Sequence, residues 1–232
     1  MKTRLPRRLI EAGARRRVWF FDLDDTLHDA SHAIFRQIDV RMTAFVADRL
    51  ALDHEAANRL RLHYWRRYGA TMLGLLRHHA IDHRDFLRET HDFDVAALLR
   101  IEAGVGARLA RLPGRKVLLT NAPQDYAGRV LRSGGLHRLL DAVYAIESMR
   151  RFGRFRPKPS RALLKLLLAR ERLAGAALRG RAVLVEDNLA NLKAARAVGM
   201  RTVLVQRPGR TQLRGRSYVD ARLNSIRRIG RV

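Results

Sequence analysis

The run Val18 to Phe21, with the sequence VWFF, is followed directly by three carboxylates at Asp22, Asp24 and Asp25. Four consecutive apolar residues are typical of a strand that is buried on both faces of a parallel sheet. Asp22 and Asp24 are two positions apart, so in an extended chain their side chains share one side. Carboxylates that lie so close together repel each other unless a cation or a shared proton compensates for their charge. The fold must therefore supply a cation or a shared proton at the end of this strand.

Short apolar runs recur along the chain, and amphipathic stretches lie between them. The apolar runs are Lys116 to Thr120, Ala182 to Val185 and Thr202 to Val205. The amphipathic stretches are Asp125 to Arg132, Ser160 to Ala177 and Leu189 to Val198. We also expect a weaker strand over Val143 to Ile146 and another near Tyr218 and Val219. Strands that alternate with helices predict an α/β fold, with a Rossmann-like, doubly wound core around a parallel sheet.

The segment over residues 30–99 departs from this alternation. It contains no convincing β run, and its apolar residues fall at helical spacing, as at Ile34, Ile38 and Met42. A segment of this length is too long for an ordinary loop of a compact α/β unit. We therefore expect an all-helical cap that is inserted after the first strand and packs over the carboxyl ends of the strands, where open α/β sheets bind ligands. The predicted boundaries are 1–17 for a basic N-terminal segment, 18–29 and 100–232 for the core, and 30–99 for the cap.

A second acidic pair, Glu186 and Asp187, follows another apolar run, so the arrangement at Asp22 and Asp24 recurs at a second strand end. A lone Asp-x-Asp is at least as often a solvated acidic loop as a binding site. Two acidic strand ends at one edge of a sheet are a stronger signal, because their carboxylates converge. Mg²⁺ prefers hard oxygen ligands and is commonly held by one or two carboxylates together with substrate phosphate. The sequence therefore predicts an Mg²⁺ site at this edge.

Two further positions carry groups that can hold phosphoryl oxygens. Thr120 and Asn121 follow a third apolar run and offer a hydroxyl and an amide, although a Thr-Asn pair before Ala-Pro can also be an ordinary turn. Lys158 lies between Pro157 and Pro159, which stiffen its backbone. A single Lys is usually a surface charge, but almost all other basic residues of this chain are Arg. A Lys held between prolines therefore indicates that its ammonium group is a point charge with a specific binding role.

Composition limits the remaining classes of function. The chain has 232 residues, of which 47% are hydrophobic, enough for a packed core with a smaller insertion. It has no Cys, which excludes disulfides, thiolate nucleophiles and zinc-thiolate sites. The N-terminal sequence lacks the apolar core of a signal peptide, and no apolar run approaches the length that spans a bilayer. We therefore expect a cytoplasmic protein without a membrane partner.

The formal net charge is +25, from 47 Lys and Arg against 22 Asp and Glu. Such a charge attracts nucleic acid, anionic membranes or small phosphate-bearing molecules. Because the basic residues are scattered and only 6% of residues are aromatic, we predict no stacking platform for bases. We favour the interpretation that most of this charge lies on solvated, Arg-rich faces. Such faces should bind polyanions without specificity. A polyanion-binding protein without catalysis is the alternative from another class.

Taken together, these motifs resemble those of a known family. The matching residues are Asp22 to Thr26, Thr120 with Asn121, Lys158, and Glu186 with Asp187. In order and approximate spacing they are similar to the four motifs of the haloacid dehalogenase superfamily, and the resemblance covers residues 18–220. Four motifs in order are far more specific than any one of them. The resemblance implies that the helical insertion is the family's cap.

The resemblance also implies a reaction. Asp22 would be the nucleophile that forms an aspartyl-phosphate, and Asp24 would protonate the leaving oxygen and then deprotonate the attacking water. The dehalogenases that named the superfamily need no leaving-group acid, so the presence of Asp24 favours phosphoryl transfer over carbon–halogen cleavage. A phosphomutase uses the same acid and base, and the core motifs leave that alternative open.

Further roles follow for the groups around Asp22. The resemblance implies that Mg²⁺ is held by Asp22, the backbone carbonyl of Asp24 and Asp187, with Glu186 as a further ligand or a close neighbour. The two remaining groups, Thr120 and Lys158, would stabilise charge on the transferring phosphoryl group.

Substrate choice should reside in the cap. The segment His63 to Asp82 resembles the YxxYGxTxxGL-type segment of the pyrimidine 5'-nucleotidase branch, and Phe86 to Asp94 resembles the segment that follows it. Tyr64 and Tyr68 would then face the substrate, or else pack between helices. The resemblance implies a nucleoside 5'-monophosphate as substrate, with a pyrimidine base. Sugar phosphates and phosphoglycolate are the alternatives, with either a phosphatase or a phosphomutase acting on them.

Overall fold

The structure is a computed structural model that describes residues 17–173, 175, 180–206 and 217–230. The chain divides into two compact units. One unit is Ala30–Leu99, and the other combines the chain before Ala30 with the chain after Leu99. Apart from Arg17, the predicted basic N-terminal segment lies outside the described residues. Among the described residues, no helix combines the length and apolar character needed to cross a bilayer.

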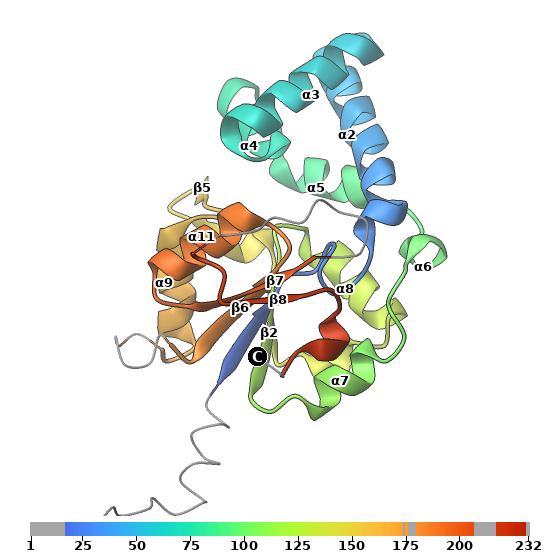
Figure 1. Ribbon diagram of the computed structural model, residues 1–232. Coiled ribbons are helices and arrows are strands. Elements are labelled where there is room, and N and C mark those ends of the chain that lie inside the picture. Colours follow the sequence, from blue (N-terminus) through green and yellow to red (C-terminus); the bar gives the residue numbers. More distant parts are fainter. Residues whose placement is uncertain (1–16, 174, 176–179, 207–216, 231–232) are drawn as a thin grey trace, which may run out of the picture. The chain divides into compact units, whose positions relative to one another are not determined.

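The core unit contains a six-stranded sheet in which all pairs of neighbouring strands are parallel (Figure 1). In spatial order the strands are β3 (Ala142–Tyr144), β2 (Arg115–Leu119), β1 (Val18–Phe21), β6 (Ala182–Glu186), β7 (Arg201–Val205) and β8 (Ala221–Leu223). Phe21 pairs with Leu118 on one side and with Val185 on the other, so β1, β2 and β6 end at the same level. From β1 the chain first adds β2 and β3 on one side and then β6, β7 and β8 on the other. Open α/β sheets bind ligands at the point where the strand order reverses in this way.

Helices cover both faces of this sheet. On one face lie α7 (Val105–Arg111) and α8 (Gln124–Ser133), and on the other lie α9 (Arg161–Arg170) and α11 (Leu189–Ala197). The reversal of strand order explains this division, because right-handed crossovers running in opposite directions place their helices on opposite faces. The predicted Rossmann-like, doubly wound fold is therefore confirmed.

Several predicted boundaries differ from the structure. The helix expected over residues 160–177 ends at Arg170, where Arg172 adopts a left-handed conformation with φ of 58°. The weak strand expected over residues 143–146 is β3, which ends at Tyr144. The strand expected near Tyr218 begins only at Ala221, because its pairing with β7 starts at Val203.

A short antiparallel hairpin that the apolar pattern did not predict precedes Lys158. It consists of β4 (Arg150–Arg151) and β5 (Arg154–Phe155), joined by Phe152 and Gly153, both with positive φ. Phe152 is 99% exposed, and the guanidinium carbon of Arg151 lies 5.9 Å from the centre of its ring. The hairpin gives no signal in the apolar pattern, because three of its four strand residues are Arg and each strand is too short to show an apolar period.

The unit Ala30–Leu99 is entirely helical. Its elements are η1 (Ala30–His32), α2 (Ile34–Leu50), α3 (His54–Tyr68), α4 (Thr71–His78), α5 (His83–His91) and α6 (Val95–Leu98). Asp53, Asp82 and Asp94 each accept a backbone N–H at the start of a helix, which satisfies donors that have no intrahelical partner. Gly69 ends α3 with φ of 81°, a conformation that costs Gly least. The role of this unit as a cap stays a prediction.

Candidate active site

The polar groups of the core gather where three neighbouring strands end. Asp22 follows β1, Thr120 follows β2, and Glu186 is the last residue of β6. The backbone N–H of Asp22 donates to the carbonyl of Val185 over 3.0 Å, which continues the pairing of the two strands up to the acidic residues. All three polar side chains are buried. The alignment of these strand ends therefore brings together residues that are far apart in sequence.

Lys158 provides the positive charge that the strand ends require. Its Nζ donates to Asp22 Oδ1 over 2.6 Å and to Glu186 Oε2 over 2.7 Å, and the side chain is 3% exposed. Burial by itself lowers the pKa of Lys158, but the two carboxylates outweigh burial and raise its pKa above the ordinary value. The ammonium group is therefore charged and fixed between Asp22 and Glu186.

Asn121 holds the backbone of Lys158. Its Oδ1 accepts the backbone N–H of Lys158 over 2.9 Å, and its Nδ2 donates to the carbonyl of Lys158 over 3.0 Å. The amide thus holds the backbone of Lys158 through both its ends, and because Nδ2 carries a second hydrogen, phosphate binding by Asn121 stays a prediction. By contrast, Thr120 Oγ1 accepts the backbone N–H of Ala122 over 3.1 Å, which leaves its hydroxyl proton to donate.

Asp22, Glu186 and Asp187 each offer an oxygen within 4.8 Å of the others. Burial, followed by the charge of Glu186, raises the pKa of Asp22 well above its usual range. Burial and the charge of Asp22 raise the pKa of Asp187 to about 6. Three carboxylates face the single ammonium of Lys158, so the cluster has excess negative charge and hard oxygen donors, the combination that suits a divalent cation.

The two oxygens of Glu186 already accept hydrogen bonds. Oε2 accepts from Lys158, and Oε1 accepts from the backbone N–H of Asn188 over 3.2 Å. Asp187 is less buried than Glu186 and follows it at the very end of the strand. Of the two acidic residues at the end of β6, Asp187 is therefore better suited to ligate a metal.

Asp24 is held by two residues that sequence analysis did not assign to the site. Its Oδ1 accepts from the hydroxyl of Tyr126 over 2.7 Å and from Nε2 of His28 over 2.9 Å. Tyr126 lies in the first turn of α8, and His28 lies in the loop after β1. Burial, followed by the charge of Asp24, raises the pKa of Tyr126, so the phenol stays protonated and acts as a donor. The only sign in the sequence that α8 contributes to the site was the hydroxyl of Tyr126 at a buried helix position.

Comparison with known proteins adds to this geometry. The family model for haloacid dehalogenase-like hydrolases matches residues 17–199, which include all the strand-end groups described above. The chain belongs to this family. The match confirms the family that the four motifs predicted.

Individual relatives of this haloacid dehalogenase-like hydrolase are distant. Phosphate metabolism protein 8 of Saccharomyces cerevisiae is 25% identical over 211 residues, covering 86% of this chain and 64% of that protein. The chain therefore spans slightly less than two thirds of the length of this curated relative.

Solved structures share the fold at low sequence identity. A HAD phosphatase from Thermococcus onnurineus has a TM-score of 0.62 at 18% identity, covering 93% of this chain and 96% of that one. CbbY from Rhodobacter sphaeroides, solved with phosphate, has a TM-score of 0.61 at 22% identity, covering 92% and 96%. YfnB from Bacillus subtilis, solved with magnesium, has a TM-score of 0.58 at 14% identity, covering 90% and 95%.

The helical unit of the hydrolase contains the two predicted specificity residues. Tyr64 is 6% exposed, and its hydroxyl lies 2.7 Å from Nε2 of His79. A Cβ on Gly74 would lie 2.2 Å from the Tyr64 ring, so the absence of a side chain there makes room for the ring. Tyr68 is less buried and contacts Nε2 of His78 over 2.5 Å. The segment that resembles nucleotidases is thus at least partly a packing motif.

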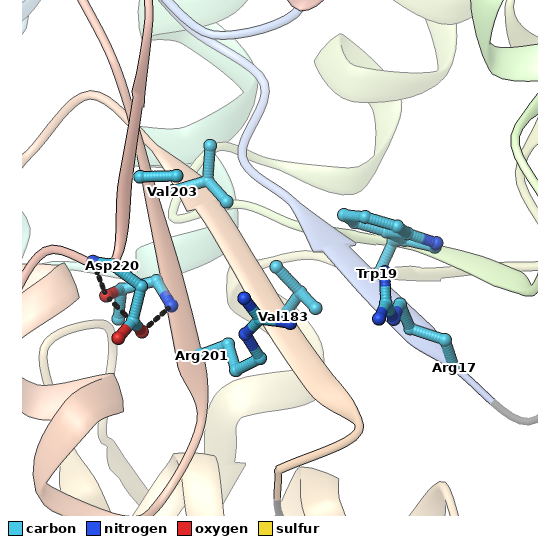
Figure 2. Close-up of a pocket in the computed structure, with 8 residues that line it drawn as sticks. Arg17, Trp19, Val183, Arg201, Val203 and Asp220 are labelled. Atoms are coloured by element: carbon cyan, nitrogen blue, oxygen red, sulfur yellow. Dashed lines mark hydrogen bonds between the residues drawn. The ribbon is translucent and has the colours of Figure 1, made fainter. Parts of the chain in front are cut away.

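The core unit also has a pocket near the amino ends of the strands, whereas the candidate active site lies at their carboxyl ends. Figure 2 shows that it is lined by side chains near the amino ends of the strands, including Arg17, Trp19 and Arg201. Asp220 in this pocket accepts from the backbone N–H of Thr202 over 2.8 Å. Asp22, Glu186 and Asp187 are not among the residues that line this pocket. It is therefore separate from the candidate active site.

Proposed function

We propose that this haloacid dehalogenase-like hydrolase is a phosphatase that cleaves small phosphomonoesters through an aspartyl-phosphate on Asp22. The observation that carries the proposal is the placement of Lys158 between Asp22 and Glu186 at the carboxyl edge of the sheet. A buried ammonium group at a nucleophilic carboxylate can neutralise the oxygens of an approaching phosphoryl group. Its charge also opposes the rise in the pKa of Asp22 that burial causes, because a neighbouring cation favours the charged form.

In the first step, an oxygen of Asp22 would attack phosphorus in line with the ester oxygen. The new bond joins Asp22 to phosphorus, and the bond between phosphorus and the ester oxygen breaks. Protonated Asp24 gives its proton to the departing oxygen, which leaves as an alcohol. Thr120 would donate its hydroxyl proton to a phosphoryl oxygen, since its own oxygen is already an acceptor for Ala122.

In the second step, the carboxylate of Asp24 would take a proton from water while the water oxygen attacks phosphorus. The bond between Asp22 and phosphorus then breaks, which releases inorganic phosphate and restores both carboxyl groups. Spontaneous hydrolysis of phosphomonoesters is among the slowest biological reactions, and enzymes accelerate it by up to about 10²¹-fold. The concentration of positioned charge at these strand ends is consistent with that demand.

The cofactor we propose is Mg²⁺. Asp22, Asp187 and the backbone carbonyl of Asp24 would hold the ion, which when bound supplies positive charge to the phosphoryl oxygens. Glu186 would act next to the ion, since both its oxygens already accept hydrogen bonds. The excess of carboxylates over ammonium groups in the cluster supports this assignment.

We further propose a nucleoside 5'-monophosphate with a pyrimidine base as the substrate. The support is the resemblance of residues 63–82 to the pyrimidine 5'-nucleotidase branch. Of the two tyrosines in that segment, Tyr68 is the better candidate for substrate contact, because the Tyr64 ring is packed against Gly74. Trp65, which is largely exposed, offers another aromatic face on the same helix.

The experiment is a panel of phosphate esters assayed for released phosphate in Mg²⁺, with Asp22→Asn as the control. The panel includes UMP, CMP, dUMP, purine monophosphates, phosphoglycolate and hexose phosphates. Selective release from pyrimidine monophosphates, absent in Asp22→Asn, is the expected result. Release from the other esters would overturn the substrate but keep the phosphatase. Interconversion of hexose phosphates without release would indicate a phosphomutase, and salt-sensitive polyanion binding with no turnover would contradict the enzyme.

A further inference from the structure

Oxygen Oδ1 of Asp24 receives two hydrogen bonds, while Oδ2 receives none from the described residues. An ionised carboxylate only accepts, so Nε2 of His28 must carry the proton that points at Oδ1. The other ring nitrogen, Nδ1, has no hydrogen-bond partner among the described residues, so Asp24 is the group that orients the ring. The two oxygens of one carboxyl group are therefore in different environments.

We propose that Tyr126 and His28 are positioning residues that fix Asp24 through Oδ1 and so make Oδ2 the oxygen that transfers the proton. This inference rests on the proposed function. A proton on Oδ1 would face two donors, whereas a proton on Oδ2 leaves both hydrogen bonds intact. The proton that passes to the ester oxygen therefore leaves from Oδ2, and the proton taken from water returns to Oδ2.

Packing alone does not explain the polar groups of these two residues. His28 and Tyr126 are completely buried, and Phe could fill the space of Tyr126 if only the ring mattered. The hydroxyl of Tyr126 bridges 102 positions of sequence to reach Asp24, so it ties the start of α8 to the loop after β1. A buried polar group is costly unless it is paired, and here the partner of both groups is the proposed acid.

This arrangement also indicates a class of substrate. A fixed general acid contributes most where the leaving group is an alkoxide, which cannot depart without a proton, and least where it is a stable phenolate. The site is therefore built for esters of ordinary alcohols, such as the 5'-hydroxyl of a nucleoside or a sugar hydroxyl. With 4-nitrophenyl phosphate, whose leaving group needs no proton, the step that phosphorylates Asp22 should depend little on Tyr126 and His28.

The test compares kcat/KM, which reports the phosphorylation of Asp22 and not the later hydrolysis step common to both esters, for an alkyl phosphate and for 4-nitrophenyl phosphate in wild type and Tyr126→Phe. We expect Tyr126→Phe to lower kcat/KM on the alkyl ester by about 10- to 100-fold, and on the nitrophenyl ester by less than about threefold. The matched control is Tyr144→Phe, which removes a hydroxyl that donates to Glu171 over 2.9 Å, away from the carboxyl edge. Equal losses on both esters, or no loss on either, would overturn the inference.

A second pair of variants keeps the test decisive if Tyr126→Phe folds poorly. His28→Leu removes the other donor and should reproduce the selective loss, whereas His28→Gln can donate from its side-chain amide and should restore part of the alkyl rate. Equal rates for His28→Gln and His28→Leu would contradict the inference. Wild-type protein that releases phosphate from neither ester would contradict the proposed function itself, which distinguishes the two failures.

Discussion

In the core unit, Lys158 reaches Asp22 across 136 positions of sequence, and Tyr126 reaches Asp24 across 102. In the helical unit, Tyr64 reaches His79 across only 15 positions. Both sets of contacts involve buried polar groups within motifs that resemble those of known enzymes. The long-range contacts tie separate strand ends to one carboxylate cluster, whereas the local contact ties one helix to the end of the next. A motif that resembles one of a known enzyme can therefore mark a proposed catalytic cluster in one unit and local packing of helices in the other.

The largest expected effect is that of Asp22→Asn on catalysis. An amide cannot act as the nucleophile, so kcat on the preferred ester should fall by about 10³-fold or more. Circular dichroism and thermal unfolding would show whether the variant remains folded. Asp125→Asn, at an exposed position of α8, is the control and should retain full activity. Wild-type kcat in the Asp22→Asn protein would remove the basis for assigning chemistry to the core contacts.

Lys158→Met should cause the largest loss of stability. It would leave Asp22 and Glu186 buried without their ammonium partner, which should lower the free energy of unfolding by about 3–5 kcal/mol. Urea unfolding at neutral pH measures this change. Lys165→Met, at an exposed position of α9, serves as the control and should change the value by less than about 0.5 kcal/mol. Similar small effects for both variants would mean that the buried ion pairs contribute little.

Removal of Mg²⁺ should lower the thermal midpoint of the wild-type protein. An ion present at 100 times its Kd stabilises the folded state by about 2.7 kcal/mol. Asp187→Asn should abolish most of this gain, because it removes a proposed ligand and excess negative charge from the cluster. Differential scanning calorimetry with Mg²⁺ and with EDTA provides the comparison. A gain in Asp187→Asn as large as that of wild type would exclude this carboxylate as a ligand.

Gly74→Ala tests the helical unit. The new methyl group would meet the buried Tyr64 ring, and such overpacking should cost about 1–3 kcal/mol in the free energy of unfolding. Gly106→Ala, in α7, is the control because its Cβ would meet neighbours only at ordinary van der Waals distances. That control should be neutral or stabilising by up to about 1 kcal/mol. If both variants were neutral, the motif around Gly74 would need an explanation other than packing.

The sequence predicted the parts of the fold that have a local signal. The apolar runs gave β1, β2, β6 and β7, and the acidic residues after β1 and β6 marked the two strand ends that form the cluster. The hairpin β4–β5 was missed because its Arg-rich strands have no apolar face. The start of β8 was misplaced because strand limits depend on pairing with β7 as well as on composition.

The parts of the site that were missed depend on contacts between distant segments. No spacing rule connects Tyr126 with Asp24, and the position of Asn121 next to Thr120 gave no indication that its amide holds the backbone of Lys158. His28 is close to Asp24 in sequence, but the turn that brings them together includes Asp25 in a left-handed conformation with φ of 58°. Such a conformation is uncommon outside Gly, so sequence alone does not reveal it.

The most direct measurement is mass spectrometry of the enzyme after rapid acid quenching during turnover of its preferred ester. Digestion with pepsin, which works at the low pH where an acyl phosphate survives, would release a peptide that contains Asp22. The account predicts that this peptide gains the mass of one HPO₃ group during turnover, and that the gain is absent in Asp22→Asn. Phosphate release at the full rate without any phosphorylation of this peptide would contradict the proposal that Asp22 is the nucleophile.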